Sequence, residues 1–171
     1  LEIGAGSKKG KNGWTTLDMG RYCDICWDLR NGIPFPNNSI DVIYTSHTFE
    51  HIPFEGILTL VKECLRCLKK EGYLSVSVPS AKNYIEAYYS KTIFRKDGAG
   101  WKPGFCDTGS FIDQINYIAY MGNEHKYMFD EENLVNLLRI CGFSKVKLRD
   151  FNPDMDLKSR DVESIYAIAF K

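Results

Sequence analysis

The chain opens with an apolar, strand-like start that runs directly into a Gly-x-Gly turn, Leu1-Glu2-Ile3-Gly4-Ala5-Gly6. Glycines at such a turn let the backbone approach a ligand closely, and in open α/β sheets ligands bind at the carboxyl ends of the strands. Lys9 occupies the place of the third glycine that a dinucleotide fingerprint requires, and no P-loop motif follows. With Glu2 in front of the glycines, the turn suits a ligand that carries an ammonium group and no phosphate.

A second group of chemically active side chains lies in the segment His47-Thr48-Phe49-Glu50-His51. Its His-x-x-Glu-His spacing is that of an inverted zinc-protease motif, in which two histidines on one helical face bind the metal. Here the motif begins where a strand is expected to end, and Pro53 discourages a continuing helix. The two Cys-x-x-Cys pairs, which begin at Cys23 and Cys64, are divided between an expected strand and an expected helix. We therefore predict no metal site.

The elements that must position these groups alternate between strand and helix patterns. After the strand at the chain start, β-prone runs predict strands at 14–18, 23–29, 40–45, 74–78, 146–148 and 165–170. Helical spacing of apolar residues predicts one helix over 54–70, ended by Gly72, and another between the N-cap Asp130 and Gly142. Residues 7–13 are polar, rich in glycine and too few for a proper helix between the first two strands.

Five motifs, in this order, resemble those of the class I methyltransferases that use S-adenosylmethionine, in particular a small type-11-like branch. The motifs are Leu1–Gly6, Thr16–Asp18, Trp27–Leu29, Phe35–Ile43 and Ser46–His51. The resemblance covers nearly the whole chain and implies one methyltransferase domain over residues 1–171. It also implies a Rossmann-like α/β fold, with a mostly parallel sheet, an antiparallel last strand, helices on both faces and a shortened first helix.

The resemblance further implies which residues bind the cofactor S-adenosylmethionine. Asp18, at the end of the second strand, matches the family's ribose ligand, because a carboxylate accepts from two neighbouring hydroxyl groups at once. Asp28 matches the acid that accepts from the adenine amino group, and the residue after it packs on the ring. The full set of expected cofactor-binding residues is Glu2, Gly4, Ala5, Gly6, Asp18, Met19, Asp28, Leu29 and Ser46.

Residues 84–129 form an aromatic-rich insertion between sheet elements. They contain 11 of the 23 aromatic residues of the chain, with glycines at 98, 100, 104 and 109 and little periodicity. Two interpretations stay open, because such an insertion can be a lid or acceptor pocket carried by the sheet, or a small satellite core.

The composition limits the partners that we expect. The 171 residues contain 22 basic and 22 acidic side chains, so no overall field favours nucleic acid or an anionic membrane. No apolar run approaches the roughly 18 residues of a membrane span, and no signal-peptide pattern is present. We expect a cytoplasmic protein with a small-molecule partner. The segments Glu163–Tyr166 and His125–Asp130 further resemble a bacterial and archaeal branch of small methyltransferases associated with cell-surface sugar pathways, and this resemblance makes a sugar one candidate acceptor.

The expected reaction is methyl transfer to that small-molecule or sugar-type acceptor, by in-line displacement at the cofactor methyl group. A hydroxyl acceptor needs a base, for which His47 is the first candidate and His51 the second, with Glu50 and His125 as further candidates. One alternative is a non-catalytic, cofactor-binding or regulatory domain with the same fold. Another is a metallopeptidase built on the His-x-x-Glu-His motif.

Overall fold

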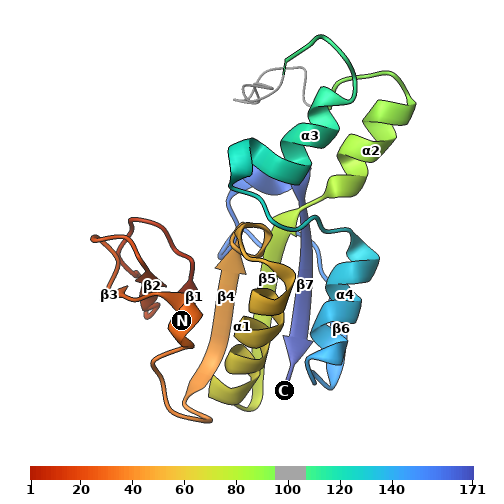
Figure 1. Ribbon diagram of the computed structural model, residues 1–171. Coiled ribbons are helices and arrows are strands. Elements are labelled where there is room, and N and C mark those ends of the chain that lie inside the picture. The colour runs from red at the N-terminus through yellow and green to blue at the C-terminus, as the bar shows by residue number, and fades with distance from the viewer. Residues whose placement is uncertain (95–106) are drawn as a thin grey trace.

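The strands of the described residues form one sheet in the order β3-β2-β1-β4-β5-β7-β6 (Figure 1). The computed structural model describes residues 1–94 and 107–171. The strands from β3 to β5 are parallel, whereas β7 is antiparallel to both of its neighbours. The bounds are β1 (Glu2–Ile3), β2 (Thr16–Asp18), β3 (Ile25–Cys26), β4 (Ile40–Ser46), β5 (Leu68–Pro79), β6 (Lys145–Leu148) and β7 (Ser164–Phe170). This confirms the predicted α/β class, the mostly parallel sheet and its antiparallel last strand.

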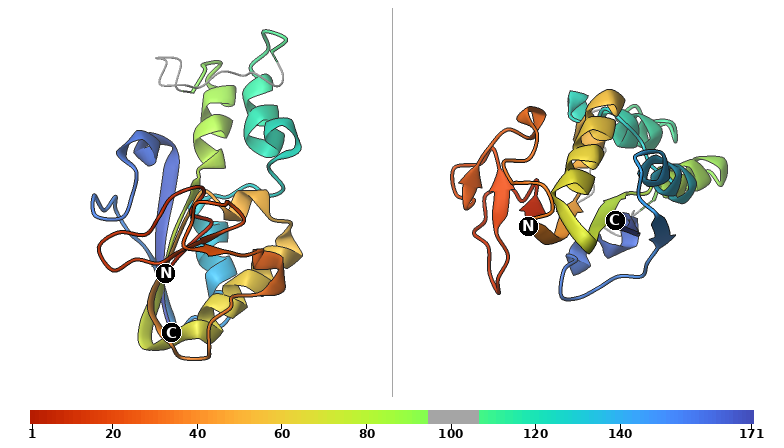
Figure 2. Two further views of the ribbon diagram at one scale, coloured as in Figure 1. Left: turned by 90° about the vertical axis from the view of Figure 1, so that its left-hand side faces the viewer. Right: turned by 90° about the horizontal axis from the view of Figure 1, so that it is seen from below.

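Side chains alternate between the two faces of the sheet, as the period of a strand requires. One face is apolar and packs against helices α1 (Phe54–Cys67) and α4 (Glu131–Ile140), which lie on the same side of the sheet (Figure 2). The residues that this face contributes to the core include Ile3, Leu17, Ile43, Leu74, Val76 and Ala167. The opposite face carries hydroxyl groups, including those of Tyr44, Ser75 and Tyr166. The loop at 149–157 and the 3-10 helix η4 (Lys158–Glu163) cover that face.

Helix α1 ends three residues earlier than the periodicity predicts, and β5 begins directly at Leu68. Gly72, predicted to stop the helix, lies instead within β5, where the register with β4 shifts between the pairs Ile40–Leu68 and Val42–Tyr73. A Cβ atom at Gly72 would meet the carbonyl oxygen of Asp41 at 2.9 Å. The glycine is therefore needed because the two backbones approach closely, a contact that helical spacing alone does not reveal.

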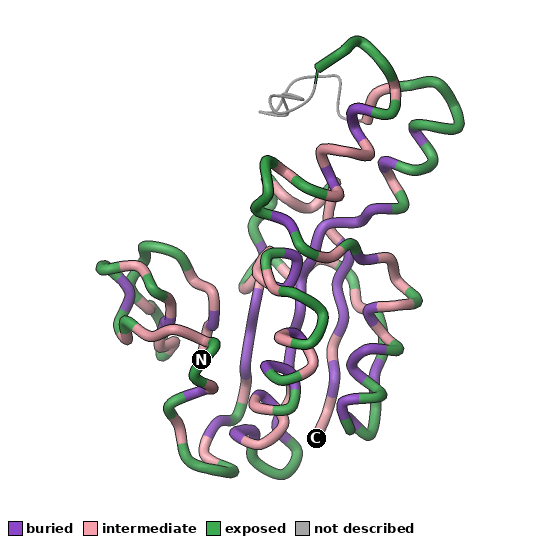
Figure 3. The backbone as a smooth tube through the Cα atoms, in the orientation of Figure 1, coloured by how far each residue is buried: buried purple, intermediate pink, exposed green. Residues whose placement is uncertain are grey.

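No helix forms between β1 and β2, so the first helix is lost rather than shortened, and the strands on either side are brief. The carboxylate of Asp24 holds this segment together, because its Oδ2 accepts hydrogen bonds from the amides of Gly10 and Thr16 at 2.9 and 3.0 Å. Figure 3 shows β4 and β5 buried over most of their length, whereas the loop after β1 is largely exposed.

The described part of the insertion contains α2 (Ala81–Tyr89), α3 (Asp113–Tyr120) and the 3-10 helix η3 (Met121–Asn123). The two helices lie beyond the carboxyl ends of β4 and β5 (Figure 1) and enclose a small cluster around Tyr84 and Ile118. The satellite core is therefore present. The glycines at 98, 100 and 104 lie outside the described residues. Among the residues described, no helix combines the length and the apolar character needed to cross a bilayer.

Candidate active site

The Gly-x-Gly turn follows β1 and meets the end of β2. The amide of Gly4 donates to the carbonyl oxygen of Leu17 at 2.9 Å, and the amide of Gly6 donates to Asp18 Oδ2 at 2.9 Å. Both glycines have positive φ angles, +68° and +66°. A Cβ atom at Gly4 would meet Thr48 Oγ1 at 2.1 Å, but one at Gly6 would have no atom within 4 Å. Gly4 thus permits close packing on the segment after β4, and Gly6 presents bare backbone to open space.

Asp18 connects this turn with the loop after β2. Its second oxygen, Oδ1, accepts from the amide of Gly20 at 2.9 Å, so one carboxylate fixes two loops. Each carboxylate oxygen offers about two acceptor positions, and one of each pair is used by these amides. Bare backbone beside a carboxylate with acceptor capacity fits a ligand that carries vicinal hydroxyl groups, as the expected cofactor does.

Other expected cofactor residues lie around this turn with partners of their own. Asp28 caps the 3-10 helix η1 (Leu29–Asn31) and binds the Arg30 guanidinium, whose Nη2 lies 2.6 Å from Asp28 Oδ2. The Arg30 side chain and amide together hold the pKa of Asp28 below its usual range. Leu29 packs partly against the core, and Met19 is exposed.

Three members of the expected set remain. Ala5 lies between the two glycines, and its amide donates to the carbonyl oxygen of Leu17 at 3.4 Å, whereas Glu2 begins β1 and Ser46 ends β4. Glu2 forms an ion pair with Lys8 at 2.7 Å and lines a hollow of about 680 Å³ on the hydroxyl-bearing face of the sheet. Ser46 is the last residue of β4, and its carbonyl oxygen accepts from Thr48 Oγ1 at 3.3 Å. The structure therefore joins the glycine turn to the end of β2, through Gly4 to Leu17 and through Gly6 to Asp18, while Glu2 and Asp28 are each engaged with a basic residue.

Strand β4 delivers a second group of polar side chains to the same edge of the sheet. His47 follows β4 with a φ of +50°, and the 3-10 helix η2 (Phe49–His51) comes next. These residues line a cavity of about 180 Å³ between the sheet edge, the insertion and η4. Its full lining is His47, Glu50, His51, Pro79, Tyr84, Tyr117, Ile118, Met121, His125, Arg160 and Glu163.

Hydrogen bonds assign the tautomer of His47. The Ser164 hydroxyl donates to the carbonyl oxygen of Arg160 at 2.7 Å, so it accepts from His47 Nε2 at 2.8 Å. Nδ1 of the neutral ring then carries a lone pair and faces Glu50 Oε1 at 3.6 Å. Burial lowers the pKa of His47 to about 3, with a further contribution from the Arg160 charge, so the ring is neutral at pH 7.

Glu50 and His125 are two buried titratable groups of the cavity. Burial raises the pKa of Glu50 to about 8, and Glu50 Oε2 has no hydrogen-bond partner in the described part of the chain. Burial also lowers the pKa of His125, whose Nδ1 donates to the carbonyl oxygen of Ile118 at 2.8 Å. All three histidines of the sequence therefore meet at this cavity.

The structure adds lining residues that the sequence did not single out, namely Tyr84, Tyr117 and Arg160. They belong to the insertion and to the segment before β7, and no local motif marks them. The metallopeptidase alternative loses its structural basis, because the His-x-x-Glu-His residues span a strand end and a 3-10 helix rather than an α-helix.

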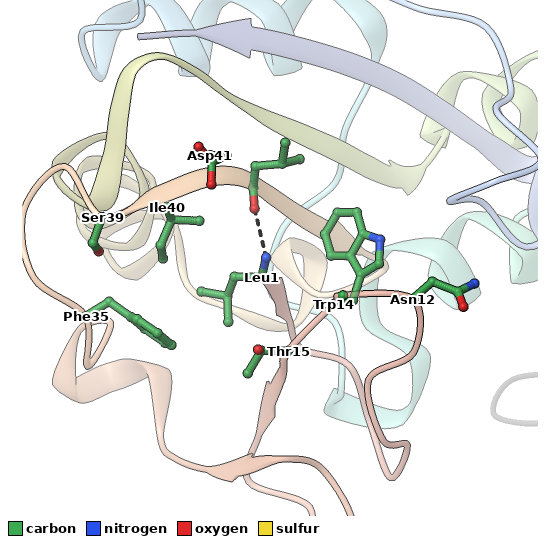
Figure 4. Close-up of a pocket in the computed structure, with 10 residues that line it drawn as sticks. Leu1, Asn12, Trp14, Thr15, Phe35, Ser39, Ile40 and Asp41 are labelled. Carbon is green, nitrogen blue, oxygen red and sulfur yellow. Dashed lines mark hydrogen bonds between the residues drawn. The ribbon is translucent and has the colours of Figure 1, made fainter.

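A separate hollow of about 320 Å³ lies at the opposite edge of the sheet (Figure 4). Leu1, Trp14 and Phe35 line it together with the start of β4, and the amino group of Leu1 donates to the carbonyl oxygen of Val42 at 2.8 Å. In open α/β folds ligands bind outside the carboxyl ends of the strands. This hollow faces their amino ends, so it is not the candidate active site.

Comparisons with known proteins give a domain match for the first part of the chain and a shared fold for the whole chain. A protein-family model described as a methyltransferase domain matches residues 3–76, which include the glycine turn, Asp18, Asp28 and the segment after β4. No curated protein matches the chain.

Solved structures share the fold at low sequence identity. A SAM-dependent methyltransferase from Thermotoga maritima is 17% identical with a TM-score of 0.63, and the match covers 99% of this chain and 80% of that one. One from Archaeoglobus fulgidus is 14% identical with a TM-score of 0.59, covering 99% and 84%. PigF, solved with SAH, is 14% identical with a TM-score of 0.51, covering 90% and 37%. The first part of the chain thus matches a methyltransferase domain, and the whole chain shares the fold of SAM-dependent methyltransferases; together they indicate an enzyme whose cofactor is S-adenosylmethionine.

Proposed function

We propose that this methyltransferase methylates a hydroxyl group of a small polar acceptor, with sugars as the first class to test. The observation that carries the proposal is the cavity of about 180 Å³ beside His47, at the carboxyl edge of β4 and β5. That volume corresponds to about six water molecules, the scale of a small molecule rather than a polymer. Its lining of imidazoles, carboxylates and one guanidinium suits an acceptor rich in hydroxyl groups.

The glycine turn and Asp18 hold the cofactor in this proposal, with the other expected cofactor residues around them. Asp18 accepts from ribose hydroxyls while it keeps the Gly6 and Gly20 amides in place. The bound cofactor supplies a methyl group on a positively charged sulfur, which becomes a neutral thioether when the acceptor oxygen takes the methyl. The residues of the enzyme then have to align the acceptor, because correct alignment removes much of the barrier.

His47 is the proposed proton acceptor. Ser164 fixes the His47 ring, because the Nε2 proton is donated to the Ser164 hydroxyl. Nδ1 is then available to accept the proton that the hydroxyl group of the acceptor loses. This is the same orienting role that a third residue plays in catalytic triads. His51 is the second candidate, because its Nδ1 lies 3.2 Å from the carbonyl oxygen of Glu124, which leaves Nε2 with a lone pair in the neutral ring.

We also propose that residues 1–171 work as one domain in which the insertion at 84–129 provides the acceptor side. The insertion contributes four residues to the cavity lining, namely Tyr84, Tyr117, Met121 and His125, which supports its assignment to acceptor binding. A cytoplasmic location and the lack of nucleic-acid and membrane partners stay predictions from the sequence.

The test has two stages. Calorimetry with S-adenosylmethionine and its demethylated product measures cofactor binding, and mass spectrometry then detects methylated products from a panel of sugars, polyols and amines. We expect transfer to a hydroxyl compound, and a decrease of roughly 10²- to 10⁴-fold in kcat for His47→Ala with unchanged cofactor affinity.

Ser164→Ala is the matched variant, because it keeps the imidazole and removes only its orienting partner. We expect a smaller decrease in kcat for it than for His47→Ala. Transfer to amines alone would overturn the choice of a hydroxyl acceptor. Cofactor binding without transfer to any acceptor would favour the non-catalytic alternative.

A further inference from the structure

The carboxylate of Glu50 and the imidazoles of His51 and His125 form a compact group in the lining of the cavity. One potential ligand atom from each residue lies within 4.8 Å of the other two, and among the described residues no other group of His, Cys, Asp and Glu side chains is as suited to a metal ion. We propose that these three side chains bind a divalent transition-metal ion, such as Zn²⁺ or Mn²⁺. This proposal departs from the prediction of no metal site made from the residue spacing alone.

The outer hydrogen bonds of the two histidines favour metal binding. His51 Nδ1 lies 3.2 Å from the carbonyl oxygen of Glu124, and His125 Nδ1 lies 2.8 Å from that of Ile118. A carbonyl oxygen only accepts, so both Nδ1 atoms must carry the proton and both Nε2 atoms of the neutral rings carry lone pairs. A backbone carbonyl on the distal nitrogen is the usual arrangement around a metal-binding histidine, because it fixes the tautomer and the ring orientation.

Glu50 provides an independent observation that points to a ligand. Its side chain is only 3% exposed, and Oε2 has no hydrogen-bond partner among the described residues. The closest charged or imidazole partners of Oε1 are His47 Nδ1 at 3.6 Å and His51 Nε2 at 3.8 Å. By the tautomers above, both nitrogens offer lone pairs rather than protons. Buried carboxylates are normally paired or bound to a metal, and a cation among these acceptors would satisfy them together.

The spacing and the donor set agree with a transition metal. Ligands bound at 2.0–2.1 Å in tetrahedral geometry lie about 3.4 Å apart, so the 3.8 Å between Glu50 Oε1 and His51 Nε2 needs only a small side-chain adjustment. Two imidazoles and one carboxylate suit zinc, manganese or iron better than magnesium or calcium, which prefer oxygen ligands alone. The side chain of His51 is 37% exposed, which gives an ion access from solvent.

Three protein ligands leave coordination positions open toward the cavity, as in catalytic rather than structural metal sites. This part of the inference rests on the proposed function. A hydroxyl group of the acceptor that binds the ion has a lowered pKa and loses its proton more easily. His47 lies outside the three-residue group and takes that proton, whereas His51 becomes a metal ligand instead of a base.

The experiment measures metal binding without reference to methyl transfer. Protein freed of metal with a chelator, and then of the chelator by dialysis, is titrated with Zn²⁺ and with Mn²⁺ by calorimetry, and its metal content is determined by mass spectrometry. We expect one ion per chain. Loss of an outer partner of a ligand typically weakens metal binding about 10- to 100-fold, so Glu50→Gln, His51→Gln and His125→Gln, which each remove a ligand, should weaken it by at least about 100-fold.

Two matched controls come from the same cavity. His47→Gln removes the third histidine, and Glu163→Gln removes the other carboxylate of the lining; both should retain the ion. Circular dichroism of every variant shows whether a lost ion reflects a lost ligand or a lost fold. A binding site that disappears in His47→Gln, or that persists in the triple ligand variant, would overturn the assignment of these ligands.

Binding of Co²⁺ distinguishes a metal ion held at this site from one held by cysteine thiolates. Cys26 is exposed, and Co²⁺ bound to a thiolate shows an intense near-ultraviolet charge-transfer band that nitrogen and oxygen ligands do not give. We expect visible d–d bands without that band, and their loss in His125→Gln. A thiolate band, or no ion bound to the folded wild type, would contradict the proposed metal site. Metal binding without any methyl transfer would instead contradict the proposed acceptor and would leave the proposed metal site supported.

Discussion

Two buried carboxylates of this enzyme, Asp156 and Glu50, have opposite surroundings. Asp156 lies under the hydroxyl-bearing face of the sheet, where Arg149 donates to both of its oxygens at 2.6 and 2.8 Å. The Tyr44 hydroxyl donates at 3.1 Å and the Asn152 amide at 2.7 Å. Glu50 is equally buried, yet one of its oxygens has no partner in the described chain.

The pKa values of the two groups follow from this difference. Burial alone would raise the pKa of Asp156, but the Arg149 guanidinium and the Asn152 amide outweigh it and hold the pKa below its usual range. Burial raises the pKa of Glu50 to about 8, because nothing of comparable strength opposes it. Burial therefore does not distinguish a structural carboxylate from a functional one, whereas the set of hydrogen-bond donors around it does.

The largest effect is expected at the fully paired carboxylate. Asp156→Ala leaves the largely buried Arg149 guanidinium without its carboxylate partner, and breaking a buried pair in this way costs about 3–5 kcal/mol. Tyr44→Phe is the milder control, since it removes one hydrogen bond worth about 1 kcal/mol. Urea unfolding measures both. If Asp156→Ala and Tyr44→Phe lowered the free energy of unfolding by the same small amount, Asp156 would be no better satisfied by hydrogen bonds than Glu50. The contrast between the two carboxylates would then be wrong.

The sequence predicts the fold well where patterns are local. The glycine turn, the N-cap Asp130 and the β-prone run from Ile40 mark elements whose signals lie within a few residues. Gly72 was misinterpreted because its role depends on the backbone of β4, which is distant in sequence. The loss of the first helix was signalled by the short, glycine-rich segment at 7–13.

The candidate site was less accessible to sequence reasoning than the fold. Gly4, Gly6 and Asp18 belong to motifs, so their meeting could be expected. The role of Glu50 depends on the tautomers of two histidines, one of which, His125, lies 75 positions further along the chain. Those tautomers are set by backbone carbonyl groups that lie near the imidazoles only in the folded chain, so the spacing of residues in the sequence cannot predict the tautomers.

Asp18 extends the comparison to a carboxylate that is only half buried and holds two loop amides. Asp18→Ala should weaken binding of the demethylated cofactor by about 1.5–3 kcal/mol, or roughly ten- to 100-fold, because a charged hydrogen-bond acceptor is lost. Calorimetry measures the affinity. Asp24→Ala is the control, since Asp24 holds Gly10 and Thr16 rather than the glycine turn. An unchanged affinity in Asp18→Ala would remove Asp18 from the cofactor site.

Glu50→Gln should have the opposite sign to Asp156→Ala. In metal-free protein the change removes a buried carboxylate without adequate partners, so we expect a gain of about 1–2 kcal/mol in the free energy of unfolding. Urea unfolding in the presence of a chelator measures it. A loss of more than about 1 kcal/mol would show that Glu50 is as well satisfied as Asp156 and that the contrast between them is not real.

The smallest effect is the acid response of Asp156. Its pKa is depressed in the folded state, so its contribution to stability is complete above the unfolded value of about 3.9 and disappears as the pH falls through the folded value. The difference in urea midpoint between wild type and Asp156→Asn should therefore narrow below about pH 4. A difference that stays constant from pH 6 to about pH 3 would contradict the depressed pKa.

The two outer strands of the sheet bear on how the protein behaves at high concentration. Exposed strand edges act as templates on which a second chain can pair, and long, flat, apolar edges aggregate. At one edge β3 has only two residues, and at the other β6 has four, with Lys145 and Lys147 both exposed. At the β3 edge the strand is too short to pair stably with a second chain, and at the β6 edge the two lysines repel an identical strand. We therefore expect the sheet to resist growth into fibrils, while the carboxyl ends of its strands stay open for ligands.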